Sequence, residues 1–385
     1  MTNRERVLAV LNYQPYDRLP IAHFGFWTET LEKWAEEGHI TAEEAKNWSD
    51  GNPTDAVISE NLGFDLNYYS VFYPNTNLAP YFDREIIEEL PDGTQKVRNY
   101  EGVVVLEKPG VRSISAEIAH LLTDRASWVE HYRHRLQFDI ERVTKAHVRV
   151  NDKMVPWEDG GLEFLQHGER DYLYGLHCGS LFGNIRNIIG VVGVSYMYAE
   201  DPDLYVEIVD TVAEVCFRCT KAALESGAKF DFAHFWEDIC FKGGPLVIPS
   251  VFDMIVGPHY KRITDLLHSH GITIISLDCD GWIDSLIPTW LSNGVNTMFP
   301  IEVGTWDASI APWRKQYGKE LRGVGGMNKT VFTRDRSAVD AEIERLKPLV
   351  AIGGYIPCPD HRIAPDAEWD NVLYYCDRMK EEFHA

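Results

Sequence analysis

Apolar runs of similar length recur along the chain, and patterns typical of amphipathic helices separate most of them. A continuous apolar, β-branched run suits a strand that is buried on both faces of a parallel sheet. Eight such strands alternating with helices predict an α/β fold, a single (β/α)8 TIM barrel. The eight runs are residues 19–25, 62–70, 172–178, 230–236, 272–277, 295–301, 321–327 and 355–358.

Some segments lie outside this alternation. Residues 94–108 contain two β-rich pieces separated by a glycine-containing turn, which predicts a β-hairpin inserted into the barrel. The polar stretch 115–149 predicts mostly helix. An N-terminal helical extension is predicted from the helical pattern at residues 3–11, before the first strand, and further helices are predicted at 28–38 and 42–49.

The competing architecture is a doubly wound sheet, for which a strand followed by G-x-G-x-x-G would be evidence. The nearest stretch, residues 323–328, lacks the third glycine at the required distance. No linker rich in proline, glycine or serine divides the chain. We therefore treat residues 1–385 as one barrel domain.

Composition and charge exclude several kinds of partner. The formal net charge is -22, from 37 basic and 59 acidic residues, so nucleic acid and anionic membranes are not expected partners. No apolar run is long enough for a membrane span, and the first residues do not resemble a signal segment. Seven cysteines, several of them in apolar segments, predict free thiols in a reducing cytoplasm.

Ionisable side chains follow most of the predicted strands at the point where each strand ends. The clearest case is Asp278-Cys279-Asp280, which directly follows the run at residues 272–277. Carboxylates and a thiol there are costly to bury without a partner. Since barrel enzymes place catalytic groups at the carboxyl ends of strands, a metal site or an acid–base pair is predicted at this mouth. The other strand ends contribute His23, His177 with Cys178, Glu237 with Asp238, Glu302, and His361.

Each of these residues also has an ordinary structural explanation. Any one of them could cap a helix, form an ion pair or make a core hydrogen bond. The set is more informative than its members, because all but two of the strands deliver an ionisable group to one end.

Aromatic residues are abundant, with 11 Trp, 18 Tyr and 17 Phe, and some follow the first two strands. A flat apolar surface of rings suits an aromatic or methyl-bearing ligand. For Trp27 the alternative is packing of the helix that it begins. The predicted substrate-binding set is His23, Phe24, Trp27, Tyr69, Phe72 and His177, with Tyr68 as a further candidate.

Several short motifs resemble the uroporphyrinogen decarboxylase superfamily, over nearly the whole chain. They are Arg-Glu-Arg-Val-Leu-Ala-Val-Leu at 4–11, Tyr-Gln-Pro-Tyr-Asp-Arg-Leu-Pro-Ile at 13–21, Gly244-Pro245, His-Arg-Ile-Ala-Pro at 361–365, and Asp-Asn-Val at 370–372. The resemblance implies a barrel. The superfamily contains porphyrin decarboxylases and also zinc-dependent methyltransferases that exchange a methyl group with a corrinoid on a partner protein.

The sequence departs from the decarboxylases at two positions. Their first strand leads into an arginine-rich segment that binds substrate carboxylates, whereas residues 23–30 contain no arginine. Their catalytic aspartate, after the second strand, falls near Phe72. An acidic, aromatic mouth would also repel a porphyrinogen with eight carboxylates. We therefore do not expect uroporphyrinogen decarboxylase activity.

The methyltransferase branch fits better, though not at every ligand. The resemblance implies a zinc site made by His-x-Cys and a later Cys, and these positions fall on Asp278, Asp280 and His361. All three can bind a metal, but none is the residue type of the family. Cys279 is an alternate ligand one residue away, and Glu237 is a further ligand or the general acid.

The sequence thus predicts a cytoplasmic methyltransferase. It would move a methyl group from a small methylated compound, such as an aryl methyl ether, to the corrinoid of a separate protein, with Zn²⁺ activating the substrate heteroatom. Two alternatives stay open. One is a metal-free lyase or decarboxylase of a small acid with His361 and Glu237 as acid and base, and the other is a non-catalytic barrel that binds a small ligand. A homodimer is an open alternative for the assembly.

Overall fold

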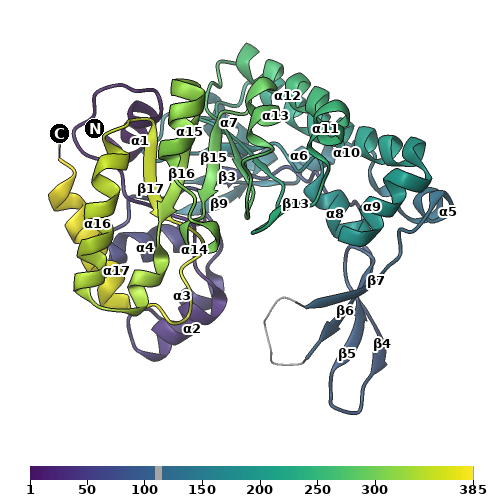
Figure 1. The fold of residues 1–385 in the computed structure, drawn as a ribbon, viewed down its shortest axis with the longest axis horizontal. Helices are drawn as coiled ribbons and strands as arrows, with labels where there is room; N and C mark the ends of the chain where they lie inside the picture. Colours follow the sequence, from purple (N-terminus) through teal and green to yellow (C-terminus); the bar gives the residue numbers. More distant parts are fainter. Residues whose placement is uncertain (109–114, 385) are drawn as a thin grey trace.

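A computed structural model describes residues 1–108 and 115–384. Its centre is a parallel sheet of seven strands with helices on the outside (Figure 1). The spatial order follows the order along the chain, as a barrel requires. The strands are β3 (Val71–Phe72), β10 (Gly175–His177), β11 (Ala233–Trp236), β14 (Ile275–Asp278), β15 (Thr297–Ile301), β16 (Arg322–Met327) and β17 (Tyr355–Pro359).

A second parallel pair lies between the two edges of this sheet. It consists of β1 (Ala22–His23) and β2 (Leu66–Asn67). Just after β1, Phe26 bridges to Ile363, and the Ile363 N–H donates to the Gly25 carbonyl at 3.0 Å. On the other side, β2 is followed four residues later by β3. Each of the eight predicted runs therefore contains an observed strand, and the (β/α)8 fold class is confirmed.

The strands are buried on both faces, as their apolar composition indicates. All residues of β14, β15 and β17 are buried. Outer helices cover them through apolar stripes. In α10 (Pro202–Glu225), Asp201 caps the first turn by accepting from the Leu204 N–H at 2.9 Å, and Pro202 occupies a position that needs no N–H donor.

The other helices have the following bounds: α1 (Asn3–Leu11), α2 (Thr28–Glu36), α3 (Ala42–Asn47), α4 (Pro53–Leu62), α5 (Arg125–Ser127), α6 (Glu141–Thr144), α7 (Gly161–His167), α8 (Gly183–Ile189), α9 (Val191–Glu200), α11 (Pro249–Ile255), α12 (Gly257–Ser269), α13 (Ile287–Ser292), α14 (Val303–Trp306), α15 (Ile310–Tyr317), α16 (Arg336–Val350) and α17 (Trp369–Glu382). None of the helices in residues 1–108 and 115–384 has both the length and the apolar character of a membrane span.

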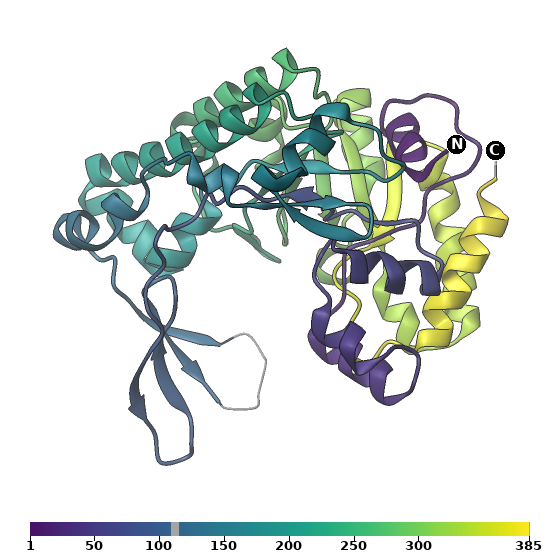
Figure 2. The same cartoon turned by 180° about the vertical axis from the view of Figure 1, so that it is seen from behind.

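The predicted hairpin is part of a larger insertion that projects from the barrel (Figures 1 and 2). It is a four-stranded antiparallel sheet of β4 (Glu85–Glu89), β5 (Gln95–Arg98), β6 (Val103–Glu107) and β7 (Ala116–His120). Val97, Val103 and Val105 form a small core of its own. The prediction of helix from residue 115 onward was wrong for β7, because this strand pairs with β6 in the inserted sheet.

Two smaller hairpins complete the described chain. The first is β8 (His147–Val150) with β9 (Lys153–Pro156), and the second is β12 (Cys240–Phe241) with β13 (Gly244–Pro245). The second follows β11 directly and so lies at the carboxyl end of the barrel strands. The Trp282 N–H, from the segment after β14, donates to the Phe241 carbonyl at 2.9 Å.

Candidate active site

Acidic residues and one histidine meet at the carboxyl ends of the barrel strands. We call Asp238, Asp278, Asp280, Glu302 and His361 the mouth cluster. Asp278 ends β14, and the chain then turns so that the Asp280 N–H donates to Asp238 Oδ1 at 3.2 Å. The His361 Nε2 atom lies 3.3 Å from Asp280 Oδ2. The fold thus joins residues that follow the fourth, fifth and eighth barrel strands.

The carboxylates of the mouth cluster lie close enough to oppose one another's ionisation. Burial, followed by the charges of Asp280 and Asp238, raises the pKa of Asp278 well above its usual range. Burial and then the charge of Asp280 also raise the pKa of Asp238. The Oδ1 atom of Asp280 is buried and has no hydrogen-bond partner among the residues that the structure describes. Such an oxygen is costly to retain unless it binds something.

Glu302 is held by groups of its own chain segment and of the neighbouring turn. Its Oε2 accepts from the Gly281 N–H at 2.5 Å, and its Oε1 accepts from the Thr305 hydroxyl at 2.8 Å. Burial and the charge of Asp280 raise its pKa. Nearby, Lys329 follows β16, and burial lowers its pKa while the surrounding carboxylates oppose that shift. It was not among the predicted site residues.

The metal prediction can be tested on this geometry. In the described ranges, no three side chains among His, Cys, Asp and Glu are arranged as they stand to hold a metal ion. Asp280 and His361 are nevertheless in contact, and their oxygen and nitrogen donors are types that zinc accepts. The unpaired Asp280 Oδ1 is a further donor. Two of the predicted ligands are therefore in contact with each other, with Asp278 nearby, but the described residues do not complete a set of three donors.

Glu237 does not join these two ligands, because its carboxylate is already hydrogen-bonded to other groups. It is completely buried, and both of its oxygens accept hydrogen bonds. Burial raises its pKa, while these donors oppose the shift. It therefore holds the start of α8 against β11, and its contacts do not support a ligand or general-acid role. The five donors are the N–H groups of Leu181, Phe182 and Gly183 at 2.8, 2.9 and 2.6 Å, the Ser180 hydroxyl at 3.1 Å, and the Tyr260 hydroxyl.

The alternate ligand Cys279 is a packed thiol. Its sulfur is buried, accepts from the Ile239 N–H at 3.4 Å, and donates to the Asp280 carbonyl at 3.5 Å. Burial raises its pKa well above the usual range, which disfavours the thiolate that binds metals. As placed, it supports the backbone between the two aspartates.

Two of the predicted aromatic residues contact His361, and a third packs on one of them. Trp27 stacks on the imidazole with ring centroids 5.6 Å apart, and Phe24 meets it edge-on at 5.4 Å. Tyr69 stacks on Phe24 at 5.8 Å. Tyr73, which sequence reasoning missed, continues the row at 6.3 Å from Tyr69. We call Phe24, Trp27, Tyr69 and Tyr73 the ring wall.

Tyr73 is the exposed end of the ring wall, with 42% of its surface accessible. The predicted substrate residue His177 stacks on Tyr73 at 4.4 Å and so lies beside this exposed end.

Two predicted substrate residues lie elsewhere in the interior. His23 is fully buried, its Nε2 lies 2.7 Å from Ser59 Oγ, and its Nδ1 accepts from the Gly25 N–H at 3.0 Å. Phe72 is fully buried and packs on Trp157 and other rings of the core. Neither side chain contacts the mouth cluster, so the substrate prediction does not extend to them.

Sequence reasoning also missed an ion pair next to His361. Arg362 donates to both carboxylate oxygens of Asp50, at 2.6 and 3.2 Å, and its guanidinium lies over the Phe24 ring at 5.5 Å. Asp50 belongs to the loop between α3 and α4. The only cue in the sequence was the position of Arg362 beside His361, because its partner is 312 residues away.

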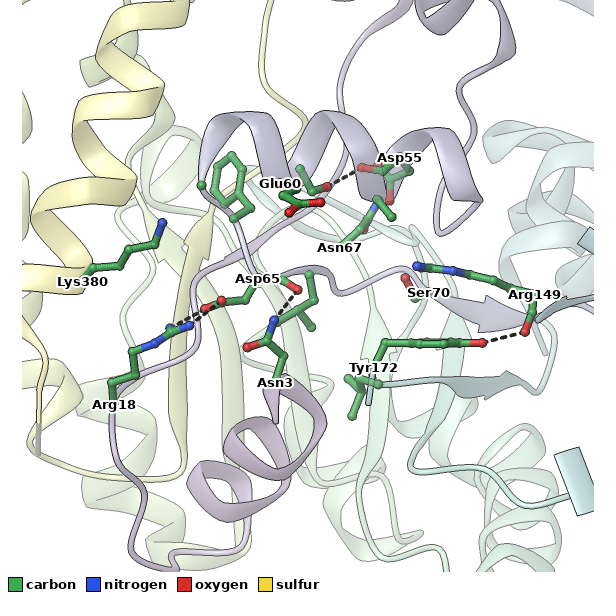
Figure 3. Close-up of a pocket in the computed structure, with 16 residues that line it drawn as sticks. Asn3, Arg18, Asp55, Glu60, Asp65, Asn67, Ser70, Arg149, Tyr172 and Lys380 are labelled. Carbon is green, nitrogen blue, oxygen red and sulfur yellow. Dashed lines mark hydrogen bonds and ion pairs between the residues drawn. The ribbon is translucent and has the colours of Figure 1, made fainter. Parts of the chain in front are cut away.

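The pocket in Figure 3 is a different site on the outside of the barrel. It has a cavity volume of about 370 Å³ and lies between α4, α17 and the β8–β9 hairpin. It contains one ion pair, in which Arg18 forms two 2.6 Å bonds with Asp65, and the Tyr172 hydroxyl donates to the Arg149 backbone carbonyl at 2.8 Å. No residue of the mouth cluster or ring wall lines it.

Comparison with known proteins gives one family and a related fold. Residues 178–382 match the family described as uroporphyrinogen decarboxylase (URO-D). No curated protein matches the sequence. A methyltransferase from Methanosarcina mazei aligns over 99% of this chain and 99% of its own, at 15% identity and a TM-score of 0.58. A B12-independent methionine synthase from Shewanella sp. W3-18-1 aligns over 95% and 98%, at 9% identity and a TM-score of 0.47.

Proposed function

This chain belongs to the uroporphyrinogen decarboxylase (URO-D) family, and on that premise we propose that it is a methyltransferase of the family rather than a porphyrin decarboxylase. The observation that supports this most is the contact between Asp280 and His361, with an unpaired buried carboxylate oxygen beside it. These two residues fall on ligand positions of the zinc-dependent methyltransferases that the sequence resembles.

Zn²⁺ is the proposed cofactor, with Asp280 and His361 as ligands and Asp278 as the nearest third donor. When bound, it would act as a Lewis acid on the heteroatom from which the methyl group leaves. A cation would also relieve the repulsion that raises the pKa of Asp278. Oxygen and nitrogen ligands leave zinc more acidic than thiolates do, which suits an ether oxygen.

The ring wall would orient the substrate. Phe24 and Trp27 flank the His361 imidazole, so a flat ligand that stacks along them brings its methyl-bearing atom toward Asp280 and His361. Arg362 is already paired with Asp50 and does not offer a free charge for a carboxylate. We propose a small uncharged compound, an aryl methyl ether, as the methyl donor.

The methyl acceptor is proposed to be the corrinoid of a separate protein, which would approach the open carboxyl end of the barrel. We place the reaction in the cytoplasm, where the seven cysteines would stay reduced. The proposed acceptor rests on the family resemblance, and the proposed location rests on the cysteines.

A metal-free lyase is the second candidate, and one observation favours it. The raised pKa of Asp278 would let a proton reside on the mouth cluster near neutral pH. In that case Asp278 and His361 would be the acid and base, because Glu237 is already occupied by five donors.

Metal content and methyl transfer together decide between the two. The full-length protein is loaded with zinc, dialysed, analysed for metal, and assayed for methyl transfer to free cob(I)alamin. The metal proposal expects one zinc per chain, and loss of both zinc and transfer in Asp280→Asn and His361→Ala. His259→Ala is the matched control, since His259 lies 2.9 Å from Asp210 on the surface. Full methyl transfer by a zinc-free protein would overturn the metal proposal. Absence of methyl transfer, together with turnover of a small acid by the zinc-free protein, would favour the lyase.

A further inference from the structure

Two histidines extend the ring wall into the barrel interior. His177 on β10 and His234 on β11 are directly paired in the parallel ladder, so their side chains lie on the same face of the sheet. Their ring centroids are 6.1 Å apart. His177 stacks on Tyr73 at 4.4 Å, and His234 meets Tyr69 edge-on at 4.8 Å. Each imidazole therefore packs against one tyrosine of the ring wall.

The hydrogen bonds of the two rings are incomplete. His177 Nδ1 accepts from the Gly179 N–H at 3.1 Å, which places the ring proton on Nε2. His234 Nδ1 lies 3.1 Å from Ser276 Oγ, while its Nε2 has no partner within residues 1–108 and 115–384 although the residue is completely buried. An unsatisfied buried nitrogen is costly to retain, so its presence in the fold needs a reason.

Charge limits what the two imidazoles can bind. Burial lowers the pKa of His177 to about 3 and that of His234 well below its usual range, so both rings are neutral near pH 7. Asp278 lies close enough to Tyr69 for each to shift the pKa of the other. An anionic ligand group bound at His177 and His234 would find no positive charge on either ring, and the nearby carboxylate of Asp278 would repel it.

We propose that His177 and His234 form a polar subsite that binds an uncharged, oxygen-bearing group of the substrate, such as a hydroxyl, and discriminates against a carboxylate. The subsite lies at one end of the ring wall, and the Asp280–His361 pair lies at the other. This inference rests on the proposed function for its orientation. It adds that the methyl donor has a second polar group, held by hydrogen bonds from the imidazoles.

One other arrangement would satisfy His234 without a ligand. Its Nε2–H could point at the face of the Tyr69 ring, a weak interaction that the edge-on contact allows. In that arrangement, removal of the imidazole nitrogens would not affect ligand binding. The variants below therefore decide between a binding role and a packing role.

The test uses ligands without a methyl ether, so it does not depend on methyl transfer. Binding of phenol, toluene and benzoate to the full-length protein is measured by ligand-observed NMR titration. We expect phenol to bind about tenfold more tightly than toluene, as for one well-formed hydrogen bond, and more tightly than benzoate. Equal affinity for the three, or tighter binding of benzoate, would overturn the subsite.

Variants assign the effect to the two histidines. His177→Phe and His234→Phe should lower phenol affinity about tenfold and leave toluene within twofold, whereas His259→Phe on the surface should change neither. His177→Phe keeps the test decisive if His234→Phe does not fold, and thermal unfolding identifies that case. A preference for phenol that survives in His177→Phe would overturn the inference. A failure of methyl transfer with this preference intact would count against the proposed function alone.

Discussion

Trp27 stacks on His361 with ring planes 16° apart and ring centroids 5.6 Å apart. Trp27 begins α2 near the start of the chain, and His361 follows the last barrel strand. The indole therefore covers one face of the proposed metal ligand and limits its rotation. Phe24 meets the same imidazole edge-on at 5.4 Å.

Substitution of Trp27 should affect the substrate more than the metal. Trp27→Ala removes the stacked ring, and we expect about a tenfold rise in KM for an aryl methyl ether, because an aromatic contact contributes about 0.5–1.5 kcal/mol. Trp27→Phe should restore most of the affinity. Steady-state kinetics and zinc analysis provide the measurements. Unchanged kinetics in Trp27→Ala would show that the indole only packs the helix.

Glu237 should behave as a structural residue. Glu237→Gln replaces one acceptor oxygen by an NH₂ group that faces backbone N–H donors, so we expect a loss of about 3 kcal/mol or more in the free energy of unfolding. Tyr260→Phe removes a single donor and should cost about 1–2 kcal/mol. Urea unfolding measures both. A normally stable Glu237→Gln protein without activity would restore Glu237 as a catalytic candidate.

Ionisation of the buried Asp55 carboxyl should make the folded protein less stable as the pH rises. Burial and the charge of Asp50 raise its pKa in the folded state from 3.8 to about 7. Between these two values the folded state binds more protons than the unfolded state, so the free energy of unfolding falls with increasing pH, by up to about 4 kcal/mol above pH 7. The stabilising contribution of protonated Asp55 to the folded state is complete only below about pH 4.

The Asp55→Asn variant tests this assignment. It should flatten the dependence of unfolding free energy on pH between pH 4 and 7, because the group that titrates is gone. Asp152→Asn, which changes an exposed aspartate, serves as the control and should keep the wild-type slope. A slope that is the same in all three proteins would assign the pH dependence to other groups.

The strands were predictable because a short continuous apolar run between helical patterns is typical of a buried strand. The helix α4 was missed, since Pro53 to Leu62 mixes polar and apolar residues without a clear stripe. The mouth cluster was predictable in outline from strand ends. The five donors to Glu237 were not, because three of them are backbone N–H groups that no sequence pattern identifies.

Residues within strands were harder to assign than residues at strand ends. His234 lies inside the run at residues 230–236, where a histidine is usually a core residue, and only the register with His177 relates it to the mouth. The substrate prediction named Phe72 and did not include the neighbouring Tyr73. Phe72 ends β3 and packs in the core, whereas Tyr73 directly follows the strand and is exposed.

Uroporphyrinogen should not be a substrate. Phe72, near the position of the decarboxylases' aspartate, packs on Trp157 in the core, and Arg362 is neutralised by Asp50. Incubation with the reduced tetrapyrrole followed by product analysis should give no coproporphyrinogen above the rate without enzyme. Enzymatic formation of that product would contradict our assignment within the family.

The proposed ligands and the ring wall come from different halves of the chain. Asp278, Asp280 and His361 lie within residues 178–382, which match the family, whereas all four rings of the wall precede residue 178. On the proposed assignment, the metal ligands and the ring wall are therefore encoded in separate stretches of the gene, and His234 is the one proposed substrate contact on the ligand side. Recombination near residue 178 would exchange the ring wall and keep the proposed ligands, which makes this boundary a crossover point to try in chimeric enzymes.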